Sequence, residues 1–182
     1  LDGRLYVTDN GPNRVPPRVV SSAPDTLWLV EEGTWYGWPD FFGGQPVTDP
    51  AFKPADAGQA ESLIANHEQL LRGKVKPPDP LISFGIHAAP CKLDFCLHPE
   101  FGFCGQAFVP EFGPLLTPLE GLPPGGRGGR QITRVDLVER TLHVFAANRP
   151  GTEGEKAGLE RPVEAKFGPD GNLYIVDLGT LD

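Results

Sequence analysis

Short apolar runs, each bounded by glycine or proline, recur along the whole chain. Runs that are rich in β-branched and aromatic residues and are closed by turn residues are typical of strands. We expect strands at 5–8, 27–30, 81–84, 93–95, 132–137 and 141–146, with a final strand pair after Arg161. The runs 132–137 and 141–146 predict a hairpin. The chain is therefore expected to be rich in β-structure.

A single stretch, residues 59–72, has the apolar spacing of a helix. The spacing i, i+1, i+4, i+7, i+8 is met by Leu63, Ile64, His67, Leu70 and Leu71. Gly73 is expected to end this helix. Because His67 lies on the apolar face, we interpret it as a packed side chain and not as a ligand.

The two ends of the sequence carry the same short pattern, an internal repeat. An Asp-Gly turn leads into a strand that contains a Leu-Tyr pair, and an acidic residue closes the strand. The pattern covers residues 1–12 and 169–180, and a weaker copy covers 103–112. Such a unit cannot bury both faces by itself, whereas copies around an axis can. The repeat therefore predicts a β-propeller.

The length of the repeat limits the size of this propeller. Because the chain begins and ends at the same point of the repeat, we expect a whole number of units, about three of roughly 60 residues each. Three blades are too few to close a ring, since propellers typically have about 4 to 8. We expect an all-β fold in which residues 1–182 are one partial domain, half of a six-bladed propeller. Its blades would be four-stranded antiparallel sheets, with one short helix in an inter-blade loop.

Residues 25–44 concentrate the aromatic side chains: all three tryptophans of the chain lie here, among four glycines. Aromatic residues between glycines are typical of backbone held close to something flat or tightly packed. From composition, we expect an aromatic core plug at the seam between two sheets.

Composition and charge narrow the classes of partner. The chain has 23 glycines and 21 prolines, which fits many turns between short strands. Its net charge is −8, and nucleic acid binding depends on lysine and arginine neutralising phosphates, so no nucleic acid partner is expected. No apolar run approaches the ~20 residues that a membrane helix needs, so no membrane partner is expected.

The three cysteines, Cys91, Cys96 and Cys104, are an odd number, which argues against a full disulfide framework. The spacing of Cys91 and Cys96 is wider than a metal-binding CxxC motif. We expect free buried cysteines. A Cys91–Cys96 or Cys96–Cys104 bridge stays open if the protein is exported.

Five stretches together resemble one enzyme family. They are LYVTDNGP (5–12), LWLVEEGTWYGWPDFFGG (27–44), HAAPCKLDF (87–95), GQAFVPEFG (105–113) and RPVEAKFGPDGNLYIVDLG (161–179). The chain resembles the glucose/sorbosone dehydrogenases, soluble aldose dehydrogenases that use pyrroloquinoline quinone (PQQ). The resemblance implies a six-bladed antiparallel propeller with PQQ over its axis and Ca²⁺ beneath the cofactor. It also implies oxidation of the C1 hydroxyl of an aldose, with a histidine base and hydride transfer to the quinone.

The resemblance assigns several residues to the cofactor. Gly11 and Pro12 match the GP motif whose carbonyls help to hold the cofactor calcium. His87 lies in the loop that approaches the cofactor and is our best candidate for a contact with it. Arg161 matches a cofactor arginine, but Val163 stands where a second arginine would follow.

Other matches are incomplete. Tyr36 and a preceding acidic pair belong to a structural calcium site in the family; Asp25 matches the first acid, but Thr26 stands at the second. The lysine expected in the loop of residues 114–131 is absent, and Arg127 or Arg130 would substitute for it.

The resemblance covers only the C-terminal half of the family. The histidine base belongs to the other half, so no catalytic base is assigned in this chain. Three interpretations stay open: a dehydrogenase or its C-terminal half, a non-catalytic half-propeller that forms a homodimer, or a fragment of a longer enzyme. The expected partners are a second copy or the missing N-terminal half, and a small sugar. The resemblance implies a periplasmic or secreted protein, although no signal peptide is found.

Overall fold

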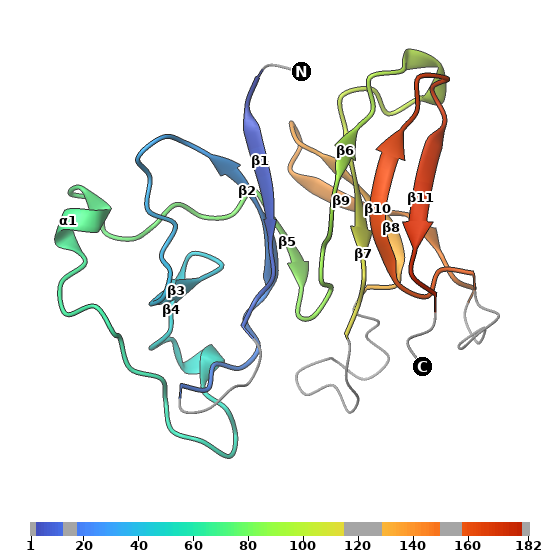
Figure 1. The fold of residues 1–182 in the computed structure, drawn as a ribbon. Coiled ribbons are helices and arrows are strands. Elements are labelled where there is room, and N and C mark those ends of the chain that lie inside the picture. Colours follow the sequence, from blue (N-terminus) through green and yellow to red (C-terminus); the bar gives the residue numbers. More distant parts are fainter. Residues whose placement is uncertain (1–2, 13–17, 115–128, 150–157, 180–182) are drawn as a thin grey trace. The chain divides into compact units, whose positions relative to one another are not determined.

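The computed structural model describes residues 3–12, 18–114, 129–149 and 158–179. Figure 1 shows the resulting strands and short helices. In chain order they are β1 (Leu5–Asp9), β2 (Asp25–Val30), β3 (Phe41–Phe42), β4 (Gln45–Pro46), a 3-10 turn (Pro50–Phe52), α1 (Glu68–Leu71), β5 (Ile82–Gly85), β6 (Asp94–Phe95), a second 3-10 turn (Pro99–Phe101), β7 (Ala107–Glu111), β8 (Gln131–Asp136), β9 (Thr141–Ala147), β10 (Pro162–Phe167) and β11 (Leu173–Asp177).

These strands form antiparallel sheets, which confirms a mostly β chain with little helix. One sheet has four strands in the order β6-β7-β8-β9, and another has three in the order β1-β2-β5. The pairs β3-β4 and β10-β11 are two-stranded. Among the described residues, only the first sheet has the four strands expected of a blade, and no closed ring is formed.

The chain divides into two compact units. The N-terminal unit is Leu5–Ile86, and the C-terminal unit is His87–Asp182 together with Leu1–Arg4. A cluster of Val20, Ala23, Val47, Phe52 and Ala60 lies in the N-terminal unit. A cluster of Cys96, Phe108, Ile132 and Ala165 lies in the C-terminal unit. Each unit therefore buries an apolar cluster of its own.

The central strand of the three-stranded sheet is β2. β1 and β5 pair with its two edges. The first four residues of its sequence DTLWLV are all buried, so both faces of the strand are covered there, and its last four residues are apolar. Thr8 and Ile82 both pair with Leu27, which is fully buried. The edge strand β1 instead alternates between exposed and half-buried positions.

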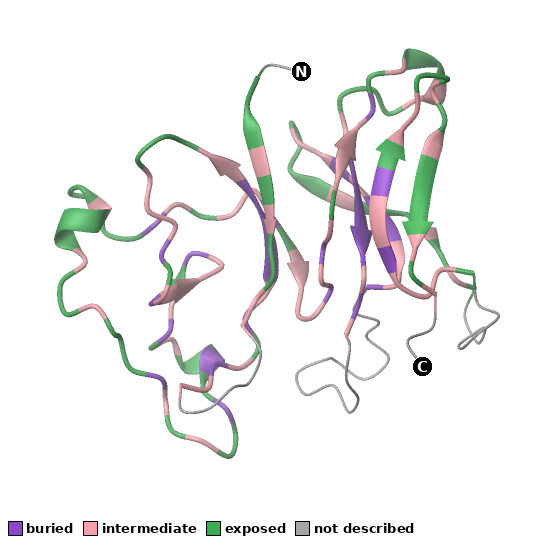
Figure 2. Cartoon of the chain, in the orientation of Figure 1, coloured by how far each residue is buried: buried purple, intermediate pink, exposed green. Residues whose placement is uncertain are grey.

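In the C-terminal unit, β7 is buried along its whole length, as Figure 2 shows. Phe108 on this strand is the centre of an aromatic cluster. Its ring centroid lies 4.9 Å from that of Phe145 and 5.3 Å from that of Phe167. Such edge-to-face contacts stabilise the sheet beyond simple burial.

Both expected C-terminal hairpins are confirmed. Between β8 and β9, the Asp136 carboxylate accepts hydrogen bonds from the amides of Val138 and Glu139, both at 3.0 Å. Between β10 and β11, Gly171 has a φ of 77°, a conformation that glycine adopts without strain. The Asp-Gly turn of the repeat therefore leads into a strand here, as the sequence pattern predicts.

The helix predicted over residues 59–72 is wrong over most of its length, because α1 covers only Glu68–Leu71. The buried Asp40 carboxylate accepts the backbone amides of Leu63 and Ile64, each at 2.8 Å. These amides are therefore not available to helical carbonyl groups. The interpretation of His67 as a packed side chain is confirmed: its ring stacks on Trp35, and its Nε2 lies 2.9 Å from Asp40 Oδ2.

The aromatic segment 25–44 is only partly a core. Trp28 is buried and packs edge-on against Tyr36, with ring centroids 5.2 Å apart. Trp38, by contrast, is 73% exposed. The expectation of a single aromatic plug therefore holds for Trp28 and not for Trp38.

The three cysteines are free thiols, and Cys96 alone among them is buried. The expectation of free cysteines is confirmed, although Cys91 is half-buried and Cys104 is exposed. No helix among the described residues has the length and apolar character needed to span a membrane.

Candidate functional site

Gly11 and Pro12, predicted to serve the cofactor calcium, lie in the connection from β1 to β2, and Asp25, predicted to serve the structural calcium, begins β2. The Gly11 amide donates a hydrogen bond to Asp25 Oδ1 over 2.5 Å. A Cβ atom at Gly11 would lie only 2.7 Å from the Ala23 carbonyl oxygen. Only glycine permits this close approach, which brings the Gly-Pro segment next to the buried Asp25 carboxylate.

This corner offers oxygen atoms of the kind that calcium binds. Among the described residues, no backbone amide donates to the carbonyl oxygen of Gly11 or Pro12. No group of three His, Cys, Asp or Glu side chains able to hold a metal ion is found in the described part of the chain. A calcium ion here would draw on backbone carbonyls, which are ordinary calcium ligands, and the described residues supply part of the oxygen shell that such an ion needs.

The predicted structural-calcium residues are not brought together in the same way. The Tyr36 hydroxyl donates to the Leu29 carbonyl at 2.8 Å and accepts the Glu31 amide at 2.7 Å. Tyr36 thus binds the end of β2, whereas Asp25 lies at its beginning. Leu29 lies four positions after Asp25 along the extended strand, about 13 Å away at ~3.3 Å per residue. Thr26, at the position of the second acid, is buried within β2.

In the C-terminal unit, the loop that carries His87 packs tightly against the end of β7. His87 and Ala89 have φ values of 57° and 50°, a left-handed conformation that is uncommon for residues other than glycine. The Ala88 carbonyl accepts the Gly113 amide at 2.9 Å, and the Ala89 carbonyl accepts the Phe112 amide at 3.0 Å. The loop is therefore held by backbone hydrogen bonds that leave the His87 side chain half-buried.

Arg161, the predicted cofactor arginine, lies at the same end of the C-terminal unit. Its Nη1 donates to the Phe112 carbonyl at 3.2 Å, and its guanidinium carbon lies 5.0 Å from the centroid of the Phe112 ring. Burial and the nearby positive charge of Arg130 lower the pKa of Arg161. The structure thus brings together Arg161 and Arg130, one of the two arginines proposed to replace the expected lysine; Arg127 lies outside the described residues.

Asp177 fixes the backbone around Arg161. Its carboxylate accepts the amides of Glu160 at 2.9 Å, Arg161 at 3.0 Å and Gly179 at 2.7 Å. Asp177 is the acid that closes the C-terminal copy of the repeat. Asp177 was not among the predicted site residues. The sequence did carry a signal for it, because an acidic residue closes each copy of the repeat.

Glu111 is a second residue that the sequence reasoning did not place in the site. It closes β7 at the equivalent point of the weaker repeat and is 1% exposed. Its Oε2 accepts a hydrogen bond from Gln131 Nε2 at 2.9 Å, and its carbonyl accepts the Arg130 amide at 2.6 Å. Glu111 therefore positions the segment that carries Arg130.

Comparison with known proteins identifies the fold. No protein-family model matches the sequence, and no curated protein matches it. Two solved structures resemble the chain. One is the holo form of the PQQ domain of pyranose dehydrogenase from Coprinopsis cinerea, with a TM-score of 0.57, 17% identity, and coverage of 96% of this chain and 48% of that one. The other is a calcium structure of a Carbohydrate-Active Enzymes family AA12 protein from Trichoderma reesei, with a TM-score of 0.53, 17% identity, and coverage of 96% and 46%.

The chain has the fold of part of a PQQ domain. It spans about half the length of both matched structures. The cofactors named for these two proteins, PQQ for one and calcium for the other, are those that the sequence resemblance implied. Neither structure belongs by name to the glucose/sorbosone dehydrogenases, so the likeness supports the general fold and not that particular family.

Proposed function

We propose that the chain is the C-terminal half of a PQQ-dependent sugar dehydrogenase of the glucose/sorbosone dehydrogenase type, which oxidises the C1 hydroxyl of an aldose. In this proposal residues 1–182 are half of a six-bladed propeller, in a periplasmic or secreted protein. The observation that carries it is the Arg161 guanidinium over the Phe112 ring, with the charge of Arg130 near enough to lower its pKa, in a chain with a PQQ-domain fold. Two neighbouring cations, one of them over an aromatic ring, suit a planar ligand that carries carboxylates.

The residues of the chain would divide the work of binding. Arg161 and Arg130 would hold carboxylates of the quinone, with His87 as a further contact. Gly11 and Pro12 would offer carbonyl oxygens, and Asp25 a carboxylate, to Ca²⁺. When bound, PQQ with its calcium supplies the hydride acceptor. Asp177 acts as a positioning residue, because it holds the amide of Arg161. The base that removes the proton would belong to the other half of the enzyme.

Binding of PQQ in the presence of Ca²⁺ tests this function. Titration of the full chain with PQQ, followed by the absorbance of the quinone and by thermal shift, is expected to show binding that EDTA abolishes. Arg161→Gln should weaken binding by about tenfold or more, since a hydrogen bond to a charged group contributes ~1.5–3 kcal/mol. Arg140→Gln, which removes the same charge from the exposed β8–β9 turn, is the control. Absence of any spectral change and any thermal shift with Ca²⁺ present would refute the proposal.

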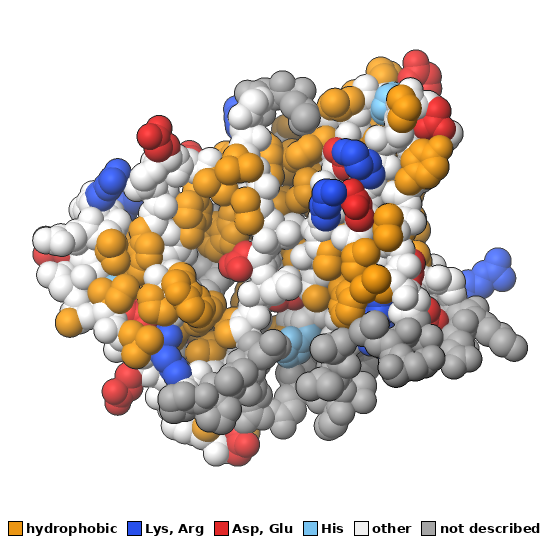
Figure 3. Space-filling view, in the orientation of Figure 1, with side chains coloured by type: hydrophobic (Ala, Val, Ile, Leu, Met, Phe, Trp, Pro, Cys, Tyr) orange, Lys and Arg blue, Asp and Glu red, His pale blue; other side chains and the backbone are white. Residues whose placement is uncertain are grey.

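A second candidate is a non-catalytic half-propeller in which two copies complete one ring. Strand β11 favours it: it is an edge strand, and Tyr174, Ile175 and Val176 are 55%, 37% and 49% exposed. Hydrophobic side chains are visible at the surface along this strand (Figures 1 and 3). An open apolar edge is a template for pairing with another chain. Light scattering should then give a stable mass of twice 19.7 kDa, and a monomer at all concentrations would contradict this candidate.

A further inference from the structure

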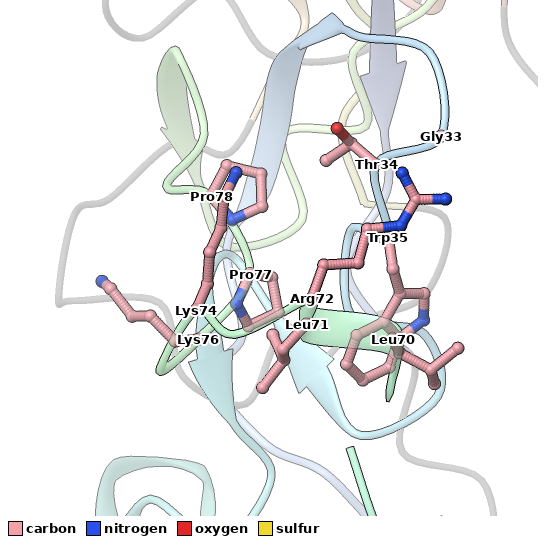
Figure 4. Close-up of a pocket in the computed structure, with 10 residues that line it drawn as sticks. All are labelled: Gly33, Thr34, Trp35, Leu70, Leu71, Arg72, Lys74, Lys76, Pro77 and Pro78. Carbon is pink, nitrogen blue, oxygen red and sulfur yellow. The ribbon is translucent and has the colours of Figure 1, made fainter. Parts of the chain in front are cut away.

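A small pocket of about 130 Å³ lies in the N-terminal unit, between two short segments of the chain. One wall is the turn of residues 33–35, and the other is the end of α1 with the segment that follows it, from Leu70 to Pro78. Figure 4 shows the Arg72 side chain extending toward the turn of Gly33 and Thr34, and Lys74 on the opposite side of the hollow, beside Pro78. Lys76, the third cation of the lining, points away from it. Two cations and one hydroxyl therefore surround the pocket.

The two cations are not neutralised by the protein. In the described part of the chain, Lys76 pairs with Asp79 at 2.5 Å, but Arg72 and Lys74 form no ion pair. Both side chains are exposed, in a chain that has a net charge of −8 as a whole. A chain with an excess of acids thus leaves two cations without an ion pair at one hollow.

The backbone at Arg72 also points to a role for its side chain. Arg72 ends α1 in a left-handed conformation with φ 49°, where glycine is the favoured residue. A residue with a Cβ atom pays about 1–2 kcal/mol for this conformation. Its guanidinium lies along the backbone of Gly33, where a Cβ atom would come within 2.9 Å of Nη1. The fold therefore keeps an arginine at a glycine position and a glycine beneath its guanidinium.

We propose that this pocket binds a small tetrahedral oxyanion, phosphate or sulfate, either free or as the terminal group of a larger ligand. Arg72 and Lys74 supply the charge, and the Thr34 hydroxyl supplies a further donor. The volume of 130 Å³ is well below the ~300–1,000 Å³ that encloses a drug-sized ligand, so the pocket takes the anionic group and leaves the rest of a larger molecule in solvent.

The test uses the full chain, labelled with ¹⁵N, and inorganic phosphate as the probe. Addition of phosphate is expected to shift the amide signals of Gly33 and Thr34 and the Nε–H signal of Arg72, whereas sodium chloride at the same ionic strength is not. Arg72→Gly removes the cation and relieves the left-handed backbone, so loss of binding in this variant cannot come from strain. Arg72→Gly and Lys74→Gln should each weaken phosphate binding by about tenfold. Lys53→Gln, an exposed lysine elsewhere in the same unit, should leave the affinity unchanged.

Glucose 6-phosphate distinguishes the two sources of the anion. Shifts of the same three signals would show that a phosphate carried by a larger molecule enters the pocket; shifts with inorganic phosphate alone would restrict the site to the free ion. The proposal is overturned if sodium chloride reproduces the shifts, or if Lys53→Gln weakens binding as much as Arg72→Gly. Because the test contains neither PQQ nor calcium, its result is independent of the proposed dehydrogenase function.

Discussion

Replacement of Asp40 by asparagine is expected to destabilise the N-terminal unit strongly. The Asp40 side chain is fully buried and accepts four hydrogen bonds. The donors are Arg18 Nη2 at 2.5 Å, the amides of Leu63 and Ile64 at 2.8 Å each, and His67 Nε2 at 2.9 Å. One carboxylate thus connects three segments that are distant in sequence.

The magnitude follows from the arrangement of these donors. Oδ1 receives Arg18 and Leu63, while Oδ2 receives Ile64 and His67. Asparagine keeps one acceptor oxygen, and its amide nitrogen faces the other two donors, whichever way the side chain is turned. Loss of two hydrogen bonds to a charged group, at ~1.5–3 kcal/mol each, predicts a loss of about 3–6 kcal/mol in the free energy of unfolding.

Chemical unfolding followed by tryptophan fluorescence measures this loss, because Trp28, Trp35 and Trp38 all lie in the N-terminal unit. Asp79→Asn is the matched control: this carboxylate is 63% exposed and pairs only with Lys76 on the surface, so its loss should cost about 0–1 kcal/mol. If Asp40→Asn destabilised the unit no more than Asp79→Asn does, the reasoning would be refuted.

The same interaction predicts a dependence on pH. Burial raises the pKa of Asp40, but the hydrogen bonds from Leu63, His67 and Ile64 and the charge of Arg18 outweigh it, so the pKa in the folded protein lies below its ordinary value. A carboxyl whose folded pKa is depressed contributes stability above its unfolded pKa of about 3.9 and loses it as the pH falls through the folded pKa. The difference in stability between wild type and Asp40→Asn should therefore narrow in acid below about pH 4.

Two further predictions concern the C-terminal unit. Gly129→Ala should destabilise it by about 2–4 kcal/mol, because the new Cβ atom would lie 2.2 Å from Gly113 Cα and the alanine would have to keep a positive φ. Gly105→Ala is the control: a Cβ atom there meets nothing within 4 Å, so only the backbone effect is expected. Equal losses of stability for the two variants in thermal unfolding would contradict this prediction. Iodoacetamide should modify the exposed Cys104 first and Cys91 more slowly, because burial raises the pKa of the Cys91 thiol and lowers its thiolate fraction. Modification of Cys91 before Cys104, detected by mass spectrometry, would disprove this prediction.

Much of the local structure was predictable from the sequence. The positions of most strands, both C-terminal hairpins and the Asp-Gly turn before β11 follow from apolar runs and turn residues, which act over a few neighbouring positions. Among the candidate site residues, Gly11 and Arg161 could be found by their resemblance to known motifs. Their neighbours Asp177 and Glu111 could have been found as the acids that close the repeat.

The tertiary structure decided what depends on contacts between distant residues. Periodicity predicted a helix over residues 59–72, but a carboxylate 23 residues before Leu63 takes the amides that this helix needs. The pairing of Arg161 with Phe112, 49 residues away, and its approach to Arg130 likewise depend on how the strands pack. The sequence by itself therefore determined where strands and turns form, because those preferences are local. Only folding decided which buried charges meet which donors, because a buried polar group must find its partner wherever the chain brings one.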